Sequence, residues 1–152
     1  MFGWLKSKKI SIFAPVDGEM VDLDNVPDEV FSARMAGEGM AIKPTSDIFT
    51  SPVNGTVSKI FDTNHAYVVK NGELEVIVHI GIDTVNLKGE GFTRIASVGD
   101  KVKVGDPIIK VDLPFLEANA KSTITPIVVN SSKISIKENG KIKQGNLIME
   151  AE

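Results

Sequence analysis

The feature that most constrains the fold is a turn signal that recurs every eight to twelve residues along much of the chain. Asp-Gly or Asn-Gly pairs stand at 17–18, 54–55, 71–72 and 139–140, and Gly-Asp pairs at 99–100 and 105–106. Between such signals lie short runs rich in β-branched residues, among them KISIFA (9–14), PIIKVD (107–112) and VVNSSKISI (128–136). Short strands at this spacing are typical of all-β sandwiches and barrels.

Helical patterns occur in only two windows. PDEVFSARMAGEG (27–39) and LPFLEANAKS (113–122) each carry a proline near the start, where helices accept it. The GEG at 37–39 is the predicted stop of the first helix. We therefore expect a few short helical turns on an otherwise all-β chain.

Two pairs of segments resemble each other and indicate a duplication. APVDGEMV (14–21) and SPVNGTVSKI (51–60) share a Pro-Val-polar-Gly plan. VGDKVKVGDPIIKVD (98–112) and ENGKIKQGNLIMEAE (138–152) share a later turn-and-strand plan. Repeats of this kind predict related substructures that pack together. The fold class we expect is an all-β sandwich or barrel with an internal repeat.

Composition narrows the function classes. The chain has 152 residues, which suits one domain, and its net charge of −3 gives no basic footprint for nucleic acid. No apolar run approaches the roughly 18 residues of a membrane span. The absence of cysteine excludes thiol chemistry and disulfides and fits a reducing cytoplasm.

The first nine residues, MFGWLKSKK, form a short basic tail ahead of a domain over 10–152 whose core is expected at about 28–132. We expect the tail to be solvated. The alternative is a weak contact with anionic lipid through Phe2, Trp4 and the lysines.

Both histidines of the chain flank one predicted hairpin. Asn71-Gly72 is a strong hairpin signal, and a two-residue loop there would pair Lys70 with Glu73. His65 and His79 would then lie on neighbouring rungs but on opposite faces. For the two rings to meet, the chain must bulge or twist near residues 63–65.

Several kinds of site can be weighed for two histidines. A serine-type triad has no signature here, and a zinc enzyme usually needs three protein ligands. No glycine-rich phosphate loop followed by Lys-Ser/Thr is present. One histidine could act as the nucleophile and the other as its electrostatic helper, and a phosphoryl group suits this pair because its transfer needs mainly positioning and charge stabilisation.

TNHA (63–66) and HIGIDTV (79–85) closely resemble the two active-site motifs of the glucose-type enzyme IIA family of the bacterial sugar phosphotransferase system. VPDEVF (26–31), AIKPT (41–45), KGEGF (88–92) and VKVGD (102–106) fit the same family, so the resemblance runs from about residue 10 to the end of the chain. The resemblance implies an antiparallel β-sandwich, of the barrel-sandwich kind, with a duplicated hybrid motif.

The resemblance also implies roles for the motif residues. His79 would be phosphorylated on Nε2, His65 would stabilise the phosphoryl group in transfer, and Thr63 would orient His65. The donor would be the phosphocarrier protein HPr, and the acceptor a cysteine on the IIB domain of a sugar permease. No cofactor is required, and a cytoplasmic monomer is expected.

The resemblance further implies a partner-binding face around the histidines, with an apolar collar and an acidic rim. The residues implied are Asp28, Val30, Phe31, Met35, Phe61, Ile77, Asp83 and Val85. The same face could serve regulatory targets. As a separate hypothesis, His65 and His79 could supply half of a zinc site that a partner completes.

Alternatives from other classes stay open on the sequence. A biotin or lipoate carrier would share the strand motifs, but its lysine stands at a hairpin tip flanked by methionines, and Lys70 has none beside it. A zinc hydrolase on a related β-fold would need a His-x-His pair, which is absent. A non-catalytic binding module is the third alternative.

Overall fold

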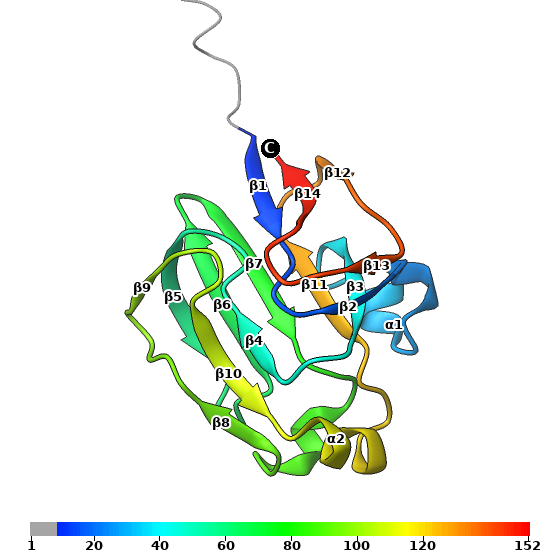
Figure 1. Cartoon of the computed structure of the whole chain (residues 1–152). Coiled ribbons are helices and arrows are strands. Elements are labelled where there is room, and N and C mark those ends of the chain that lie inside the picture. The colour runs from blue at the N-terminus through cyan, green and yellow to red at the C-terminus, as the bar shows by residue number, and fades with distance from the viewer. Residues whose placement is uncertain (1–8) are drawn as a thin grey trace, which may run out of the picture.

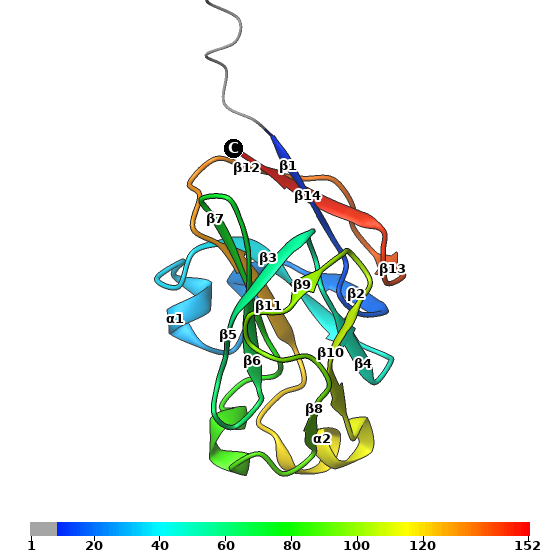
Figure 2. The same cartoon turned by 90° about the vertical axis from the view of Figure 1, so that its left-hand side faces the viewer.

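The computed structural model describes residues 9–152, and its strands form three antiparallel sheets (Figures 1 and 2). The large sheet has the strand order β13-β2-β3-β11-β7-β6-β5-β9, and two smaller sheets have the orders β1-β14-β12 and β4-β10-β8. The strands are β1 (Ile10–Phe13), β2 (Gly18–Val21), β3 (Glu38–Pro44), β4 (Ile48–Thr50), β5 (Gly55–Ile60), β6 (Ala66–Asn71), β7 (Leu74–His79), β8 (Phe92–Arg94), β9 (Lys101–Val102), β10 (Pro107–Val111), β11 (Thr125–Val129), β12 (Ile134–Ile136), β13 (Lys141–Ile142) and β14 (Leu147–Ala151).

The main core lies between the inner face of the large sheet and the two smaller sheets. Strand β7 shows why: its residues alternate between buried and half-buried, so Leu74, Val76 and Val78 point into the core. Phe49 from β4 and Ile109 from β10 meet them in the same cluster. The predicted all-β sandwich is confirmed.

The duplication predicted from the sequence is present in the hydrogen-bond pattern. Gly18 of β2 pairs with Ile142 of β13, and Gly55 of β5 pairs with Val102 of β9 in the same way. The turns before β14 and β10 also match, as four backbone bonds show: Ala14 N to Asn146 O at 2.8 Å, Ser51 N to Asp106 O at 2.9 Å, Gly145 N to Ala14 O at 2.9 Å, and Gly105 N to Ser51 O at 3.1 Å. The two Pro-Val-x-Gly segments therefore begin equivalent substructures.

The two predicted windows each contain one short helix, and two further short 3-10 turns lie outside them. The elements are η2 (Leu23–Asn25), α1 (Glu29–Ser32), η3 (Thr84–Leu87) and α2 (Leu113–Asn119). Helix α1 ends early because Arg34 takes a left-handed conformation with φ 59°, and β3 has already begun at Glu38. The GEG segment is thus not the helix stop but the entry to a strand. The segment predicted as one strand at 128–136 is split between β11 and β12.

A second, smaller core forms on the outer face of the large sheet, under η2 and α1. Leu23, Val26 and Phe31 come from this loop and pack with Ala41 of β3 and Val128 of β11. In Figure 1, α1 lies beside β3, and β7 runs away from the end of the molecule where β1 and β14 pair. The outer core therefore holds the α1 loop against the sheet near the far end of β7.

A buried hydroxyl joins the large sheet to the sheet β4-β10-β8. Tyr67 on β6 is fully buried and donates from its hydroxyl to the carbonyl of Thr50, which ends β4, at 2.7 Å. We expect Tyr67→Phe to lower the free energy of unfolding by about 1–2 kcal/mol, because the carbonyl loses a partner away from water. Urea unfolding should show a lower midpoint with an unchanged slope; an unchanged midpoint would contradict this.

The predicted N-terminal tail lies largely outside the described residues, so its expected solvation and the alternative contact with lipid both stay predictions. No helix within residues 9–152 is long and apolar enough to cross a membrane.

Candidate functional site

His79 is the last residue of β7 and lies on the outer face of the large sheet. It pairs with Ala66 at the start of β6. The predicted hairpin register was wrong by one step on each strand: Asn71 pairs with Leu74, and the two-residue loop is Gly72–Glu73 instead of Asn71-Gly72. The reason is the turn type, since Gly72 has φ 59° at the first central position, as a type II′ turn requires, and Asn71 stays in the ladder.

His65 precedes β6 and does not continue it. Residues 61–64 form a turn in which Asn64 N donates to the carbonyl of Phe61 at 2.7 Å, and Asn64 has a left-handed φ of 61°. The carbonyl of His65 still accepts from Ile80 N at 2.7 Å, so the backbone keeps its place beside β7. This turn is the departure from regular strand that the sequence predicted near residues 63–65.

The turn brings the two imidazoles together. The ring centroids of His65 and His79 are 5.0 Å apart, at an interplanar angle of 80°. Phe31 packs on His79 with centroids 5.0 Å apart, and Phe61 packs edge-on to His65 at 5.3 Å. Each histidine ring thus packs against one aromatic ring, and the two histidine rings meet edge to face.

The hydrogen bond of His79 fixes its tautomer. Its Nδ1 lies 2.8 Å from the carbonyl oxygen of Gly81. A carbonyl can only accept, so Nδ1 carries the proton and a neutral His79 keeps the lone pair on Nε2. Gly81 has φ 76°, and a Cβ there would lie 2.6 Å from Cγ2 of Thr84 and 2.9 Å from the carbonyl of Ser122. Only glycine lets this carbonyl reach His79.

The second histidine is more deeply buried. His65 is 3% exposed, and its Nδ1 lies 2.6 Å from Oγ1 of Thr63. Burial, followed by the proximity of His79, lowers the pKa of His65 from 6.5 to about 4. Burial also lowers the pKa of His79, against the opposing effect of its bond to Gly81 and of the carboxylates of Asp28 and Asp83. Both imidazoles are therefore neutral near pH 7, and neutral imidazole is the nucleophilic form.

The lowered pKa of His65 predicts a pH dependence of stability. Between about 4 and 6.5 the unfolded state binds a proton at this histidine and the folded state does not. The free energy of unfolding should therefore fall as the pH is lowered through this window, and the effect should level off below it. When the free energy of unfolding is measured in urea at several pH values, that of His65→Gln should change less with pH across the same window. An equal change with pH in both proteins would contradict the assignment.

The other residues of the predicted partner face lie on the loops around the histidines. Val30, Met35 and Val85 are 46%, 71% and 51% exposed. Asp28 caps α1 by accepting from Val30 N at 2.8 Å, and Asp83 precedes η3 in a left-handed conformation with φ 57°.

Three aromatic or aliphatic members of the predicted collar are not free surface. Phe31 is only 6% exposed and belongs to the outer core. Ile77 and Phe61 are half-buried, and the ammonium of Lys59 lies 4.5 Å from the Phe61 ring centroid. Phe31 therefore packs against the ring of His79 and offers little surface to a partner.

Metal ligands are few at this site. Within residues 9–152 no group of three or more histidine, cysteine, aspartate or glutamate side chains is placed to hold a metal ion. The two imidazoles offer two nitrogen donors, fewer than a zinc site needs from one chain.

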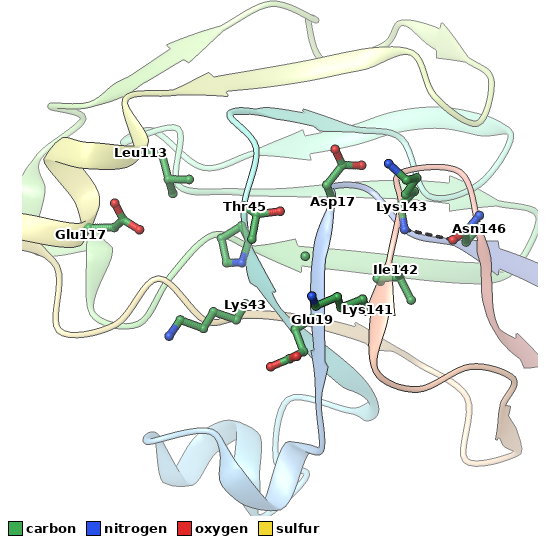
Figure 3. A pocket seen from close by; sticks show the side chains of 12 residues that line it. Asp17, Glu19, Lys43, Thr45, Leu113, Glu117, Lys141, Ile142, Lys143 and Asn146 are labelled. Carbon is green, nitrogen blue, oxygen red and sulfur yellow. Dashed lines mark hydrogen bonds between the residues drawn. The ribbon is translucent and has the colours of Figure 1, made fainter.

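A groove of about 970 Å³ lies elsewhere, between β2, β3, β13 and α2 (Figure 3). Its lining includes Lys43, Lys141 and Glu117, and neither histidine contributes to it. The groove is therefore separate from the histidine pair.

Sequence reasoning missed two residues at the site. Asn64 gives the turn its left-handed residue, and Arg94 of β8 donates to the Asn64 side chain at 2.9 Å. Asparagine tolerates the left-handed region better than most residues, which is a usable signal. The contact with Arg94 joins residues 30 positions apart and has no local signature.

The fold and the site together define a class of protein: a β-sandwich with a neutral histidine pair at the end of one hairpin. The sequence model of the family described as phosphoenolpyruvate-dependent sugar phosphotransferase system, EIIA 1, matches residues 10–135. The chain belongs to this family.

Relatives and a solved structure agree with the match. The chain is 50% identical over 123 residues to the glucose-specific EIIA component of Buchnera aphidicola subsp. Baizongia pistaciae, covering 80% of this chain and 73% of that one. It is 47% identical over 148 residues to the glucose-specific EIIA component of Haemophilus influenzae, covering 95% and 89%. The glucose permease IIA of Mycoplasma capricolum superposes with a TM-score of 0.90 at 35% identity, covering 99% of each chain.

The same fold also occurs inside larger relatives. The N-acetylglucosamine-specific EIICBA component of Klebsiella pneumoniae is 49% identical over 123 residues, which are 80% of this chain but 19% of that one.

Proposed function

We propose that this chain carries a phosphoryl group on Nε2 of His79, accepts it from HPr and passes it to a cysteine of a IIB domain. The observation that carries the proposal is the bond from Nδ1 of His79 to Gly81, because it leaves the Nε2 lone pair free in a half-buried, neutral ring. Family membership favours this role over a biotin or lipoate carrier and over a zinc hydrolase.

Both transfer steps take place at Nε2 of His79. In receipt, the N–P bond of the donor's phosphohistidine breaks as the bond from Nε2 of His79 to phosphorus forms. In onward transfer, that bond breaks as the acceptor thiolate takes the phosphoryl group, and His79 returns to its neutral form. Transfer of this kind depends mainly on positioning and on stabilising the charge of the three phosphoryl oxygens.

His65 is the proposed helper, and it matters for onward transfer more than for receipt. If the hydroxyl of Thr63 donates to its Nδ1, the proton of neutral His65 is on Nε2 and can be donated to a phosphoryl oxygen. The 5.0 Å separation of the rings suits this contact. Burial of His65 keeps water from competing for the same donor.

The exposed collar of Val30, Met35 and Val85 is the proposed docking face for donor and acceptor in turn, and regulatory proteins would meet the same face. Support for a IIB partner comes from the EIICBA relatives, whose names place A, B and C components in one chain. We propose that residues 10–152 act as one unit, as a monomer, in the cytoplasm. A zinc ion enters no step, since it would need ligands from a partner.

The test is reconstitution with purified HPr, enzyme I and isotopically labelled phosphoenolpyruvate. Label should appear on this chain only when HPr and enzyme I are both present, and it should leave on addition of a IIB domain. A chain that stays unlabelled beside a homologous enzyme IIA that becomes labelled would contradict the proposal.

The acidic rim gives a prediction about docking. Asp28 and Asp83 lie close enough to His79 to oppose the lowering of its pKa by burial, so partners should meet these carboxylates with basic side chains. We expect Asp28→Lys to slow association with HPr by roughly tenfold at low ionic strength and much less at high salt. Stopped-flow transfer at two salt concentrations measures this, with Asp47→Lys on an exposed loop before β4 as control. Association at the wild-type rate at low salt would remove Asp28 from the docking face.

A further inference from the structure

The placement of His65 poses a geometric problem. Ala66 pairs with His79, and successive residues of a strand point to opposite faces. A regular continuation of β6 would therefore point the ring of His65 into the main core, where Tyr67 lies. The ring instead lies 5.0 Å from that of His79 on the outer face. Something must hold the chain out of strand geometry at this point.

The turn at residues 61–64 does this, and it depends on an unfavourable residue conformation. Asn64 is left-handed, which costs free energy for any residue other than glycine. Backbone bonds close the turn on both sides, from Asn64 N to the Phe61 carbonyl at 2.7 Å and from Phe61 N to the Ala66 carbonyl at 2.9 Å. These bonds fix the path of the backbone but leave the outer side of the turn to side chains.

Arg94 covers that outer side. It comes from β8, which belongs to a different sheet, and its Nε donates to Oδ1 of Asn64 at 2.9 Å. Its Nη2 lies 3.5 Å from the carbonyl of Phe61, the same carbonyl that closes the turn. A guanidinium presents several donors in a rigid plane, so one side chain can contact both acceptors, which an ammonium cannot do in the same geometry.

We propose that Arg94 is a positioning residue for His65: by clamping Asn64 and Phe61 it keeps the turn that directs the His65 ring toward His79. This inference rests on the proposed phosphoryl transfer and adds a residue to that same site. Arg94 acts through the turn, and no contact with the phosphoryl group is required. Its loss should therefore affect the step that needs His65 more than the step that needs only His79.

The experiment compares Arg94→Lys and Arg94→Gln with Asn64→Gly and with the control Lys110→Gln. Glycine accepts the left-handed conformation but removes the Oδ1 acceptor. Lys110 lies on β10, opposite Thr93 in the ladder next to Arg94, and its change removes one exposed charge from the strand that pairs with β8. Each protein is examined by nuclear Overhauser contacts between the ring protons of His65 and His79, and by rates of receipt from HPr and of delivery to IIB.

Both Arg94 variants should weaken the ring-to-ring contact and slow delivery about tenfold, as loss of a supporting residue typically does, while receipt changes less than delivery. Lys110→Gln should match the wild type. Because Arg94 acts partly through Asn64, the double variant Arg94→Lys with Asn64→Gly should slow delivery by less than the product of the two single effects.

The inference would be overturned if both Arg94 variants kept wild-type ring contacts and wild-type delivery rates. That result would leave the proposed function intact. Full additivity of Arg94→Lys and Asn64→Gly would overturn the route through Asn64. Failure of the wild type itself to take up phosphate would count against the proposed function, and the ring contacts would still decide whether Arg94 positions His65.

Discussion

His79→Ala should lose all labelling by phospho-HPr while the protein stays folded. Nε2 of His79 is the one imidazole nitrogen at this site that combines a fixed neutral tautomer with a half-exposed position. His65 cannot replace it, because it is 3% exposed and its Nδ1 is bonded to Thr63. The fold should survive, since the lost contact with Phe31 is worth about 1 kcal/mol.

Labelling of His79→Ala is measured beside His65→Gln, which disturbs the same site but keeps the proposed acceptor. Circular dichroism and the urea midpoint show whether each variant is folded. Acid-labile, base-stable phosphate on folded His79→Ala would mean that another group is the carrier.

His65→Gln should give the second large effect, and on a different step. We expect it to accept phosphate from HPr but to deliver it to IIB about 10²–10⁴-fold more slowly. The glutamine amide can donate a hydrogen bond over a similar reach, but it lacks the rigid ring that Thr63 and Phe61 hold in place, so its donor is not fixed on the phosphoryl oxygen. Receipt should suffer less, because the nucleophile and its bond to Gly81 are unchanged.

Single-turnover quench experiments separate the two steps, since phosphorylated protein can be isolated and then mixed with IIB. Thr63→Val serves as the graded comparison. It should slow delivery by roughly tenfold, because it frees the ring of His65 without removing it. Equal delivery rates for His65→Gln and wild type would deny His65 a part in the transfer.

Much of this fold could be predicted because its signals are local. The alternation of Leu74 to His79 fixes which side chains of β7 enter the core, and the structure keeps that alternation. The Pro-Val-x-Gly repeat is equally local, and Gly18 and Gly55 make equivalent ladder pairs. The alternation along one strand does not depend on which residue of the next strand it pairs with, so the faces of β7 were predicted correctly even though the hairpin loop was not.

The rest depends on contacts between distant segments. The short α1 ends at Ser32, and the guanidinium of Arg34 just beyond it donates to the carbonyl of Ser32 and pairs with Asp24, ten residues away. Such an ion pair cannot be inferred from helix propensity within the window. The same holds for Arg94 on Asn64, where a strand of another sheet settles the conformation of a turn.

Burial of Phe31 is a further case. From the sequence it was indistinguishable from the exposed collar, because Val30 and Phe31 are adjacent and both apolar. The second core beneath α1 decides between them: Phe31 packs with Leu23 and Val128, and Val30 faces outward. A helix of only four residues has too little periodicity to reveal its inner face.

The central claim is that Nε2 of His79 carries the phosphoryl group, and nitrogen-15 NMR of the phosphorylated protein tests it most directly. Uniformly labelled protein is phosphorylated with phosphoenolpyruvate, enzyme I and HPr, and long-range proton–nitrogen correlations of both imidazoles are recorded before and after. We expect Nε2 of His79 alone to acquire a bond to phosphorus, while Nδ1 keeps its proton and its hydrogen bond to the carbonyl of Gly81. A phosphorus bond at Nδ1 of His79, or at either nitrogen of His65, would contradict this expectation.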